Sequence, residues 1–268
     1  MDYDKYMKKC IELAKGGEGQ TSPNPLVGCV VLDKDGNEIS TGFHHKYGEN
    51  HAERDALLKL TNGEEKGGTL IVNLEPCSHH GKTPPCADLI IERGLKRVVI
   101  GMQDVNPIVA GNGIKKLKNA GIEVVEHVLE DECKILNEVF IKNMTQKKVF
   151  VAIKTATTLD GKIATQNGSS KWITSEKARE EVKVIRNRYD AIMTSSATIL
   201  ADNPTMLHRK KIILDRKLRT NLEAPIYKNG EIYLFNDSLD MFEGGINFIK
   251  TPVHDEKLDL EFIFNKAY

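Results

Sequence analysis

Two short motifs constrain the fold most, because their side chains make chemical sense only if they meet in space. The first is His51-Ala52-Glu53, which opens a predicted helix, and the second is EPCSHHGKTPPC at residues 75–86, which follows a predicted strand. The imidazole of His51 and the thiolates of Cys77 and Cys86 suit a tetrahedral zinc ion. Three protein ligands leave one position for water, which zinc activates at neutral pH. The motifs therefore predict a catalytic zinc site.

Glu53 stands two residues after the histidine, so it need not bind the metal and can carry protons. A glutamate beside a His/Cys/Cys zinc site is the pattern of zinc nucleobase deaminases. That pattern usually has two residues between the cysteines, whereas eight separate Cys77 from Cys86. A structural zinc site that recruits His79 or His80 as a fourth ligand is an alternative, but it gives Glu53 no role.

The composition excludes several classes of protein. The 268 residues suffice for one large domain or two ordinary ones, and 38 basic residues balance 38 acidic ones. Zero formal net charge argues against a nucleic acid or an anionic membrane as partner. No apolar run is long enough to span a bilayer, and the N-terminal segment lacks the features of a signal peptide. Five cysteines, an odd number, do not suit a disulfide framework, so we expect a cytoplasmic protein with a small-molecule partner.

Strand-like and helix-like segments alternate in both halves, which predicts a mixed α/β layered fold. LVGCVVLD and EISTGFH flank the turn KDGN and predict a hairpin, and a continuous helix is expected at residues 130–143. The polar stretch NMTQKK at residues 143–148 is the best boundary, so we predict domains at 1–145 and 146–268. The second half is expected to begin with a strand at residues 149–157.

The motifs SPNPLVGCVV, HAE, EPCSHHGKTPPC and D-x-NP…GxGI together resemble the bifunctional deaminase–reductase family of riboflavin biosynthesis, over residues 3–143. The long gap between the cysteines is characteristic of that family. The resemblance implies a cytidine-deaminase-like three-layer α/β/α domain with a mixed sheet, holding one zinc ion on His51, Cys77 and Cys86, with Glu53 as the catalytic proton carrier. The implied reaction is hydrolytic deamination of 2,5-diamino-6-(5-phosphoribosylamino)pyrimidin-4-one. The implied contacts to this substrate are Asn24, His44, His79, Lys82 and Asn106.

The second half is similar to the NADPH-dependent reductase domain of the same family, a dihydrofolate-reductase-like α/β fold. The segments that carry the similarity are VAIKTATTLDGKIAT, GSSKWIT and IRNRYDAIMTSSATILADNPTM. The similarity implies that the cofactor contacts are Lys154, Ala156, Trp172, Thr198 and Asp202. It implies that the substrate contacts are Ser170, Arg186, Met206 and Arg209.

The family's glutamate- and glycine-rich cofactor loop has no counterpart at the expected place in this sequence. Glu243-Gly244-Gly245 comes too early in the order of elements and is interpreted as a turn. We therefore expect a partial reductase domain with weak or absent reductase activity. Uncovered sheet edges and apolar surface would favour a homo-oligomer.

Two other functions stay open from the sequence. The first is a deaminase of another base, such as a tRNA adenosine deaminase. That function requires a basic surface and two residues between the cysteines, and the sequence has neither. The second is a non-catalytic, zinc-stabilised nucleotide-binding module, for which Glu53 has no purpose.

Overall fold

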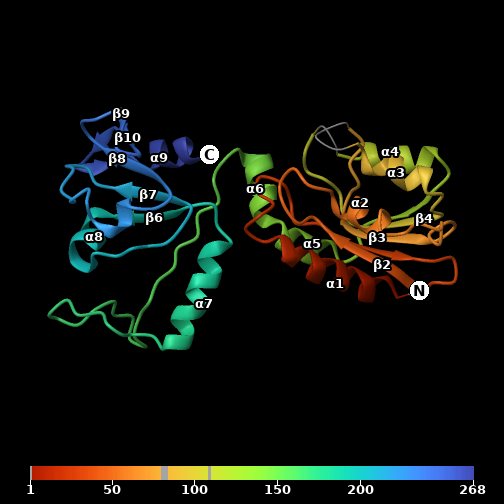
Figure 1. Ribbon diagram of the computed structural model, residues 1–268, viewed down its shortest axis with the longest axis horizontal. Helices are drawn as coiled ribbons and strands as arrows, with labels where there is room; N and C mark the ends of the chain where they lie inside the picture. The colour runs from red at the N-terminus through yellow and green to blue at the C-terminus, as the bar shows by residue number, and fades with distance from the viewer. Residues whose placement is uncertain (1, 80–83, 108–109) are drawn as a thin grey trace. The chain divides into compact units, whose positions relative to one another are not determined.

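The computed structural model describes residues 2–79, 84–107 and 110–268 (Figure 1). The chain divides into two compact units, Met1–Lys147 and Lys148–Tyr268, and each is described by itself. The polar stretch NMTQKK predicts a boundary after residue 145, close to this division.

A five-stranded mixed sheet of order β2-β1-β3-β4-β5 forms the centre of the first unit. Its first two pairings are antiparallel, including the predicted hairpin, and its last two are parallel. All residues of β1 and β3 are buried, as is typical of strands that are covered on both faces. The strands are β1 Gly28–Leu32, β2 Glu38–Phe43, β3 Thr69–Leu74, β4 Arg97–Met102 and β5 Glu123–Val125.

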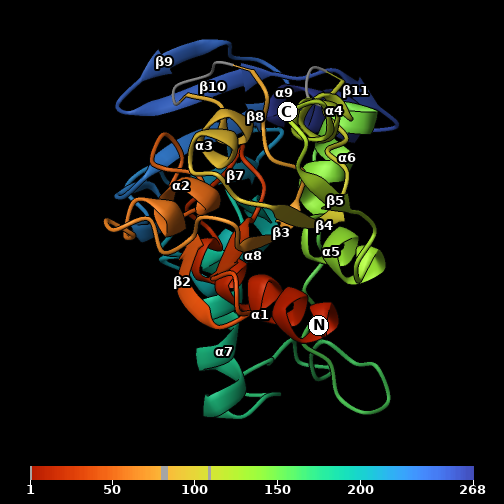
Figure 2. The same ribbon diagram turned by 90° about the vertical axis from the view of Figure 1, so that its right-hand side faces the viewer.

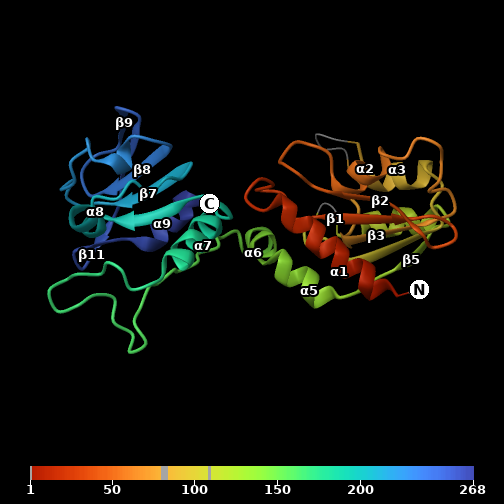
Figure 3. The same ribbon diagram turned by 60° about the horizontal axis from the view of Figure 1, so that its bottom comes forward.

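Helices cover both faces of this sheet, α1 and α5 on one face and α2, α3 and α4 on the other (Figures 2 and 3). The predicted three-layer α/β/α arrangement is thereby confirmed. In α1, Asp2 caps the first turn, and Met7, Cys10 and Ala14 are buried against the sheet. The helices are α1 Tyr3–Ala14, α2 Ala52–Leu57, α3 Cys86–Glu92, α4 Asn112–Asn119, α5 Glu130–Leu136 and α6 Glu138–Gln146, with a 3₁₀ turn at Lys15–Gly17.

The helix predicted at residues 130–143 is two helices, which are divided at Asn137. The backbone of Asn137 leaves helical values, at φ −105° and ψ 21°. Its buried amide accepts from the Leu26 N–H at 2.8 Å and donates to the Leu26 carbonyl at 3.0 Å. A buried amide needs such partners, so this long-range pairing fixes the bend.

The second unit contains a five-stranded sheet of order β6-β7-β8-β10-β9, parallel except for β9. Gly244 and Gly245 turn the chain between β9 and β10, so the interpretation of this motif as a turn is confirmed. The strands are β6 Ile192–Ser195, β7 Lys210–Leu214, β8 Glu231–Asn236, β9 Met241–Glu243 and β10 Ile246–Lys250, with a small pair, β11 Val253–His254 and β12 Lys257–Leu258. The helices are α7 Glu176–Asn187, α8 Ser196–Asp202 and α9 Leu260–Ala267, with a 3₁₀ turn at Pro225–Tyr227.

The strand predicted at residues 149–157 is wrong. Residues 148–175 contain neither helix nor strand in the structure, as the trace between α6 and α7 shows (Figure 1). Ile153, an apolar residue of the predicted strand, is 86% exposed. An alternating apolar pattern yields a strand only where a neighbouring strand supplies hydrogen bonds, and no strand of the described sheet pairs with this segment.

None of the helices in the described ranges is long and apolar enough to cross a membrane.

Candidate active site

His51, Cys77 and Cys86 converge, although they come from three separate elements. His51 precedes the first residue of α2, Cys77 follows β3, and Cys86 is the first residue of α3. The His51 Nδ1 atom lies 3.5 Å from each of the two Sγ atoms. Ligand atoms of a tetrahedral zinc ion, with bonds of roughly 2.0–2.3 Å, would be about 3.5 Å apart. The three side chains therefore fit zinc in their chemistry and in their spacing.

The two sulfur atoms differ in the hydrogen bonds that they accept. The pKa of the Cys77 thiol is lowered to about 4, mainly because the Cys86 thiol donates to it. The Cys86 backbone N–H also donates to the Cys77 sulfur, at 3.3 Å. The same contact raises the pKa of Cys86 well above its ordinary value. In effect the pair shares one proton, in the place where a divalent cation would bind.

Glu53 lies in the first turn of α2, two residues after the ligand His51, and is 3% exposed. Burial, reinforced by the charge of Cys77, raises its pKa from 4.5 to about 7. A carboxyl whose pKa lies near neutrality can both accept and return a proton under physiological conditions. Glu53 therefore has the properties of an acid/base group.

A cavity of about 270 Å³ lies over these residues and gathers several of the expected substrate contacts. Asn24, His44, His79 and Asn106 all line it, with His51, Glu53 and Cys77. Lys82, the remaining predicted contact, and His80 lie outside the described residues.

His44 and Asn24 form a pair whose orientation is fixed. The His44 Nδ1 atom lies 2.9 Å from the Asn50 carbonyl oxygen, which can only accept, so Nδ1 carries the proton. The other nitrogen, Nε2, then accepts from the amide group of Asn24 at 3.1 Å. Burial lowers the pKa of His44, so the ring is neutral. His44 is thus engaged through both nitrogens, and it orients Asn24.

Sequence reasoning missed other residues of the cavity wall, namely Tyr47, Glu49, Glu75, Asp104 and Phe140. Asp104 could have been found from the sequence, because it opens the D-x-NP motif that contains Asn106. Its carboxyl accepts from the Asn106 N–H at 2.8 Å, and burial raises its pKa from 3.8 to about 6. Phe140 could not have been found in this way, because it lies inside a predicted helix far along the chain.

Two buried asparagines hold the backbone next to Asn24. Asn73 of β3 donates to the Leu26 carbonyl at 3.0 Å and accepts from the Gly28 N–H at 2.7 Å. Asn137 bonds to both backbone groups of Leu26. The loop that carries Asn24 is therefore held from the central sheet and from the end of the first unit.

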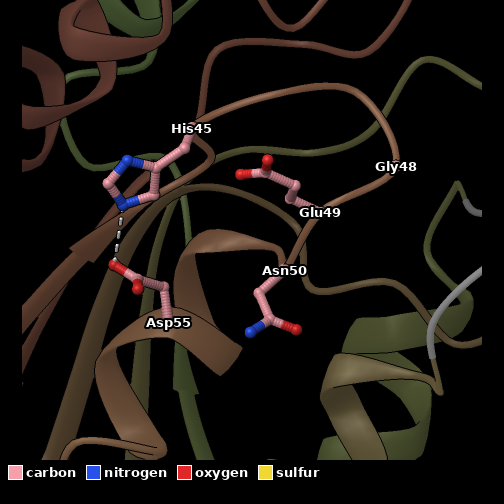
Figure 4. A pocket seen from close by; sticks show the side chains of 5 residues that line it. All are labelled: His45, Gly48, Glu49, Asn50 and Asp55. Atoms are coloured by element: carbon pink, nitrogen blue, oxygen red, sulfur yellow. Dashed lines mark ion pairs between the residues drawn. The ribbon is translucent and has the colours of Figure 1, made fainter.

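A second pocket is lined by His45, Gly48, Glu49, Asn50 and Asp55. Figure 4 shows His45 facing Asp55 across it, with His45 Nε2 at 3.4 Å from Asp55 Oδ2. Asp55 also accepts from the Phe43 N–H and from Lys59. Because Gly48 and Glu49 line both pockets, these contacts fix one wall of the cavity that contains Glu53.

The residues expected in a reductase site lie in two parts of the second unit. Thr198 and Asp202 occupy one face of α8, Met206 follows it, Arg209 forms an ion pair with Asp190, and Arg186 lies on α7. Lys154, Ala156, Ser170 and Trp172 lie in residues 148–175. Trp172 is 69% exposed and stacks under the Arg179 guanidinium at 4.2 Å. Neither of the two pockets described above is lined by any of these residues.

A mixed sheet between two helical layers, with a His/Cys/Cys site beside a buried glutamate, defines a zinc-dependent deaminase domain of the cytidine deaminase class. In agreement, residues 1–102 match the cytidine and deoxycytidylate deaminase zinc-binding region, and residues 149–240 match the RibD C-terminal domain. The chain belongs to the RibD family of riboflavin biosynthesis proteins. This membership confirms the resemblance seen in the motifs.

Individual relatives support this assignment over nearly the whole chain. Riboflavin biosynthesis protein RibD of Actinobacillus pleuropneumoniae is 43% identical over 97% of this chain and 73% of its own length. RibD of Aquifex aeolicus is 45% identical over 84% of this chain, and RibD of Escherichia coli is 46% identical over 78%. The chain spans 65% and 56% of the lengths of these two relatives.

Solved structures agree with the fold of the chain. The structure of a diaminohydroxyphosphoribosylaminopyrimidine deaminase/5-amino-6-(5-phosphoribosylamino)uracil reductase from Thermotoga maritima matches 99% of this chain and 77% of its own, with a TM-score of 0.90 and 45% identity. The structure of Acinetobacter baumannii RibD matches the same share with a TM-score of 0.85 and 37% identity.

Proposed function

We propose that this chain deaminates a diaminopyrimidine that carries a phosphoribosylamino arm, the substrate class in the name of the Thermotoga maritima relative. The observation that carries the proposal is the placement of Glu53 beside the His51, Cys77 and Cys86 group, under a cavity lined by Asn24, His79 and Asn106. Water adds to the amino-bearing ring carbon, the carbon–nitrogen bond breaks, and ammonia leaves.

Each residue contributes a distinct part of this reaction. Bound on His51, Cys77 and Cys86, zinc supplies the Lewis acidity that activates water. Glu53 accepts the proton from water and returns it to the departing amine, since its buried carboxyl lies next to the ligand group and can take either protonation state. Asn24 is oriented by His44 and presents its carbonyl oxygen to the amino groups of the heterocycle.

The phosphoribosyl arm needs partners at the mouth of the cavity. His79 and Asn106 line the wall and are proposed to contact this arm. Lys82 is proposed to join them as a point charge for the phosphate, as the family resemblance implies.

The test measures bound zinc and released ammonia in the same samples, with the diaminopyrimidine substrate and with cytidine as a control base. We expect one zinc per chain and ammonia from the first substrate only. Glu53→Ala should keep the zinc and lose at least about a hundredfold in rate. Zinc-loaded wild-type protein that releases no ammonia from the diaminopyrimidine would contradict the proposal.

For the second unit we propose the NADPH-dependent reduction of the deaminated product, the second activity of the family, at a lower turnover than in the Thermotoga maritima relative. The lower turnover is supported by the position of Lys154 and Ala156. Both lie in residues 148–175, which contain neither helix nor strand and pair with no strand of the described sheet. NADPH oxidation would be followed by its absorbance on the deaminated product. Turnover equal to that of the relative would overturn the lower rate.

We also propose that the enzyme is cytoplasmic and self-associates. Its five cysteines are all free, as in a reducing compartment. Apolar side chains on residues 148–175, including Ile153, Leu159 and Ile163, are exposed and offer a surface for a second copy. Light scattering after gel filtration would decide, since a strictly monomeric mass contradicts self-association.

A further inference from the structure

The carboxylate of Glu75 is a buried hub, meaning that it accepts hydrogen bonds from four backbone N–H groups, and it has no part in the chemistry proposed above. The residue follows β3 and is 3% exposed. Its Oε1 atom accepts from the backbone N–H groups of Gly113 and Ile114, at 2.9 and 3.2 Å. Its Oε2 atom accepts from those of Asp104 and Gly111, at 3.2 and 2.9 Å. One side chain thus binds four amides of the chain that leads from β4 into α4.

Three of these amides belong to the start of α4, which begins after Gly111. The first N–H groups of a helix have no partner within the helix, and a negative charge beside them is favourable. Glu75 therefore caps α4 from a different element of the fold. The approach is close, since a Cβ atom on Gly113 would lie 2.0 Å from the Pro76 carbonyl oxygen. A side chain at this position would force α4 and Pro76 apart.

The hub connects two walls of the cavity. Cys77, a zinc ligand, follows Glu75 by two residues. On the other side of the hub, Asp104 and Asn106 line the cavity, and they are joined by the Asn106 N–H bond to the Asp104 carboxylate. The four hydrogen bonds of Glu75 thus set the distance between the zinc ligand and the wall with Asp104 and Asn106.

We propose that Glu75 is a positioning residue of the deaminase site. It fixes Asp104 and Asn106 relative to Cys77, so that the wall that contacts the substrate arm keeps a constant distance from the zinc ligand. This inference rests on the proposed deaminase function. Glu75 acts through the amides that it binds, since both of its oxygens are occupied by them.

The main test is Glu75→Gln. Glutamine keeps the shape but replaces one oxygen with an NH₂ group, which cannot accept, so two of the four amide bonds are lost. We expect a KM for the diaminopyrimidine at least about tenfold higher, a much smaller change in kcat, and one zinc per chain. The matched control is Glu65→Gln, which alters another buried glutamate, one that pairs with Arg93 and does not line the cavity. The control should lower the melting temperature and leave KM unchanged.

Amide hydrogen exchange gives a readout that is independent of turnover. In Glu75→Gln the amides of Gly111 and Gly113 should exchange at least about tenfold faster than in wild type, while those of β3 stay protected. A second variant, Gly113→Ala, keeps the carboxylate but pushes α4 away from Pro76, and it should reproduce the higher KM. This variant decides the question if Glu75→Gln does not fold.

The outcomes separate this inference from the proposed function. A wild-type KM in both Glu75→Gln and Gly113→Ala would show that Glu75 has only a structural role, and the inference would be wrong. If the zinc-loaded wild type releases no ammonia, the proposed function fails, and equilibrium binding of the same diaminopyrimidine replaces KM in the comparison. Weaker binding with faster exchange at Gly113 would then still support a positioning role.

Discussion

The site of the first unit and residues 148–175 of the second unit have similar sequence patterns but different structures. Both carry the motifs of one family, and both contain alternating apolar residues that suit strands. In the first unit β3 is buried between β1 and β4, and the zinc ligand Cys77 follows directly from it. In the second unit the corresponding pattern has no neighbouring strand, and Ile153 is exposed.

This difference shows that a motif becomes a site only where neighbouring strands fix the ends of the elements that carry it. His51, Cys77 and Cys86 meet because α2, β3 and α3 are anchored on one sheet. The four reductase residues at 154–172 lie in a segment without helix or strand, with local turns such as the Thr158 N–H bond to the Lys162 carbonyl, and Trp172 contacts Arg179 of α7. The comparison can be tested by experiments that act on one region and not on the other.

The largest difference is expected from a pair of matched truncations, Ile71→Ala in β3 and Ile153→Ala in residues 148–175. Ile71 is fully buried in the core, so the change should lower the free energy of unfolding by about 2–5 kcal/mol. Ile153→Ala should change it by no more than about 0.5 kcal/mol. Urea unfolding, followed by far-UV circular dichroism, measures both. Equal losses would mean that residues 148–175 are packed as tightly as β3.

The second test uses the buried acid of the site, in metal-free protein. Because burial raises the Glu53 pKa from 4.5 to about 7, the unfolded chain ionises first, and the folded state loses stability as pH rises from 4.5 to 7. Glu53→Gln removes this penalty. Its free energy of unfolding should exceed that of wild type by about 3 kcal/mol at pH 8 and by almost nothing at pH 4.5.

Unfolding in the presence of a chelator at the two pH values measures this effect. In zinc-loaded protein the cation favours the Glu53 carboxylate, so the gain from Glu53→Gln at pH 8 should shrink. A gain that is equal at pH 4.5 and pH 8 would contradict a raised pKa.

The smallest effect is expected at the clamp on Leu26, which consists of the hydrogen bonds of Asn73 and Asn137 to the Leu26 backbone. Asn137→Ala leaves the two backbone groups of Leu26 without these partners, though Asn73 still binds the carbonyl. We expect a loss of about 1–3 kcal/mol in the free energy of unfolding and a higher KM, because Asn24 lies two residues from the clamp. Asn143→Ala, in the same helical region, serves for comparison. An unchanged KM in Asn137→Ala would show that the clamp contributes to the stability of the fold and not to substrate binding.

Much of the first unit follows from local signals. The hairpin at β1 and β2, the strand β3 before the cysteine motif, and the ligand set with Glu53 were all predicted, because apolar runs, turn residues and metal-binding side chains are local properties. The strand at residues 149–157 was wrong because strand formation depends on a partner. The helix at residues 130–143 was wrong in its continuity because the partner of Asn137 is Leu26, which is 111 residues away.

The sequence by itself determined the chemistry of this protein, since zinc selects thiolates and imidazole, and a proton carrier must be an acid of suitable strength. Only the tertiary structure decided how these groups are held. Burial, which no single stretch of sequence contains, raises the pKa of Glu53 toward neutrality. The four amides on Glu75 and the two asparagines on Leu26 come from segments distant in the chain, so only the packed sheet and helices bring them together.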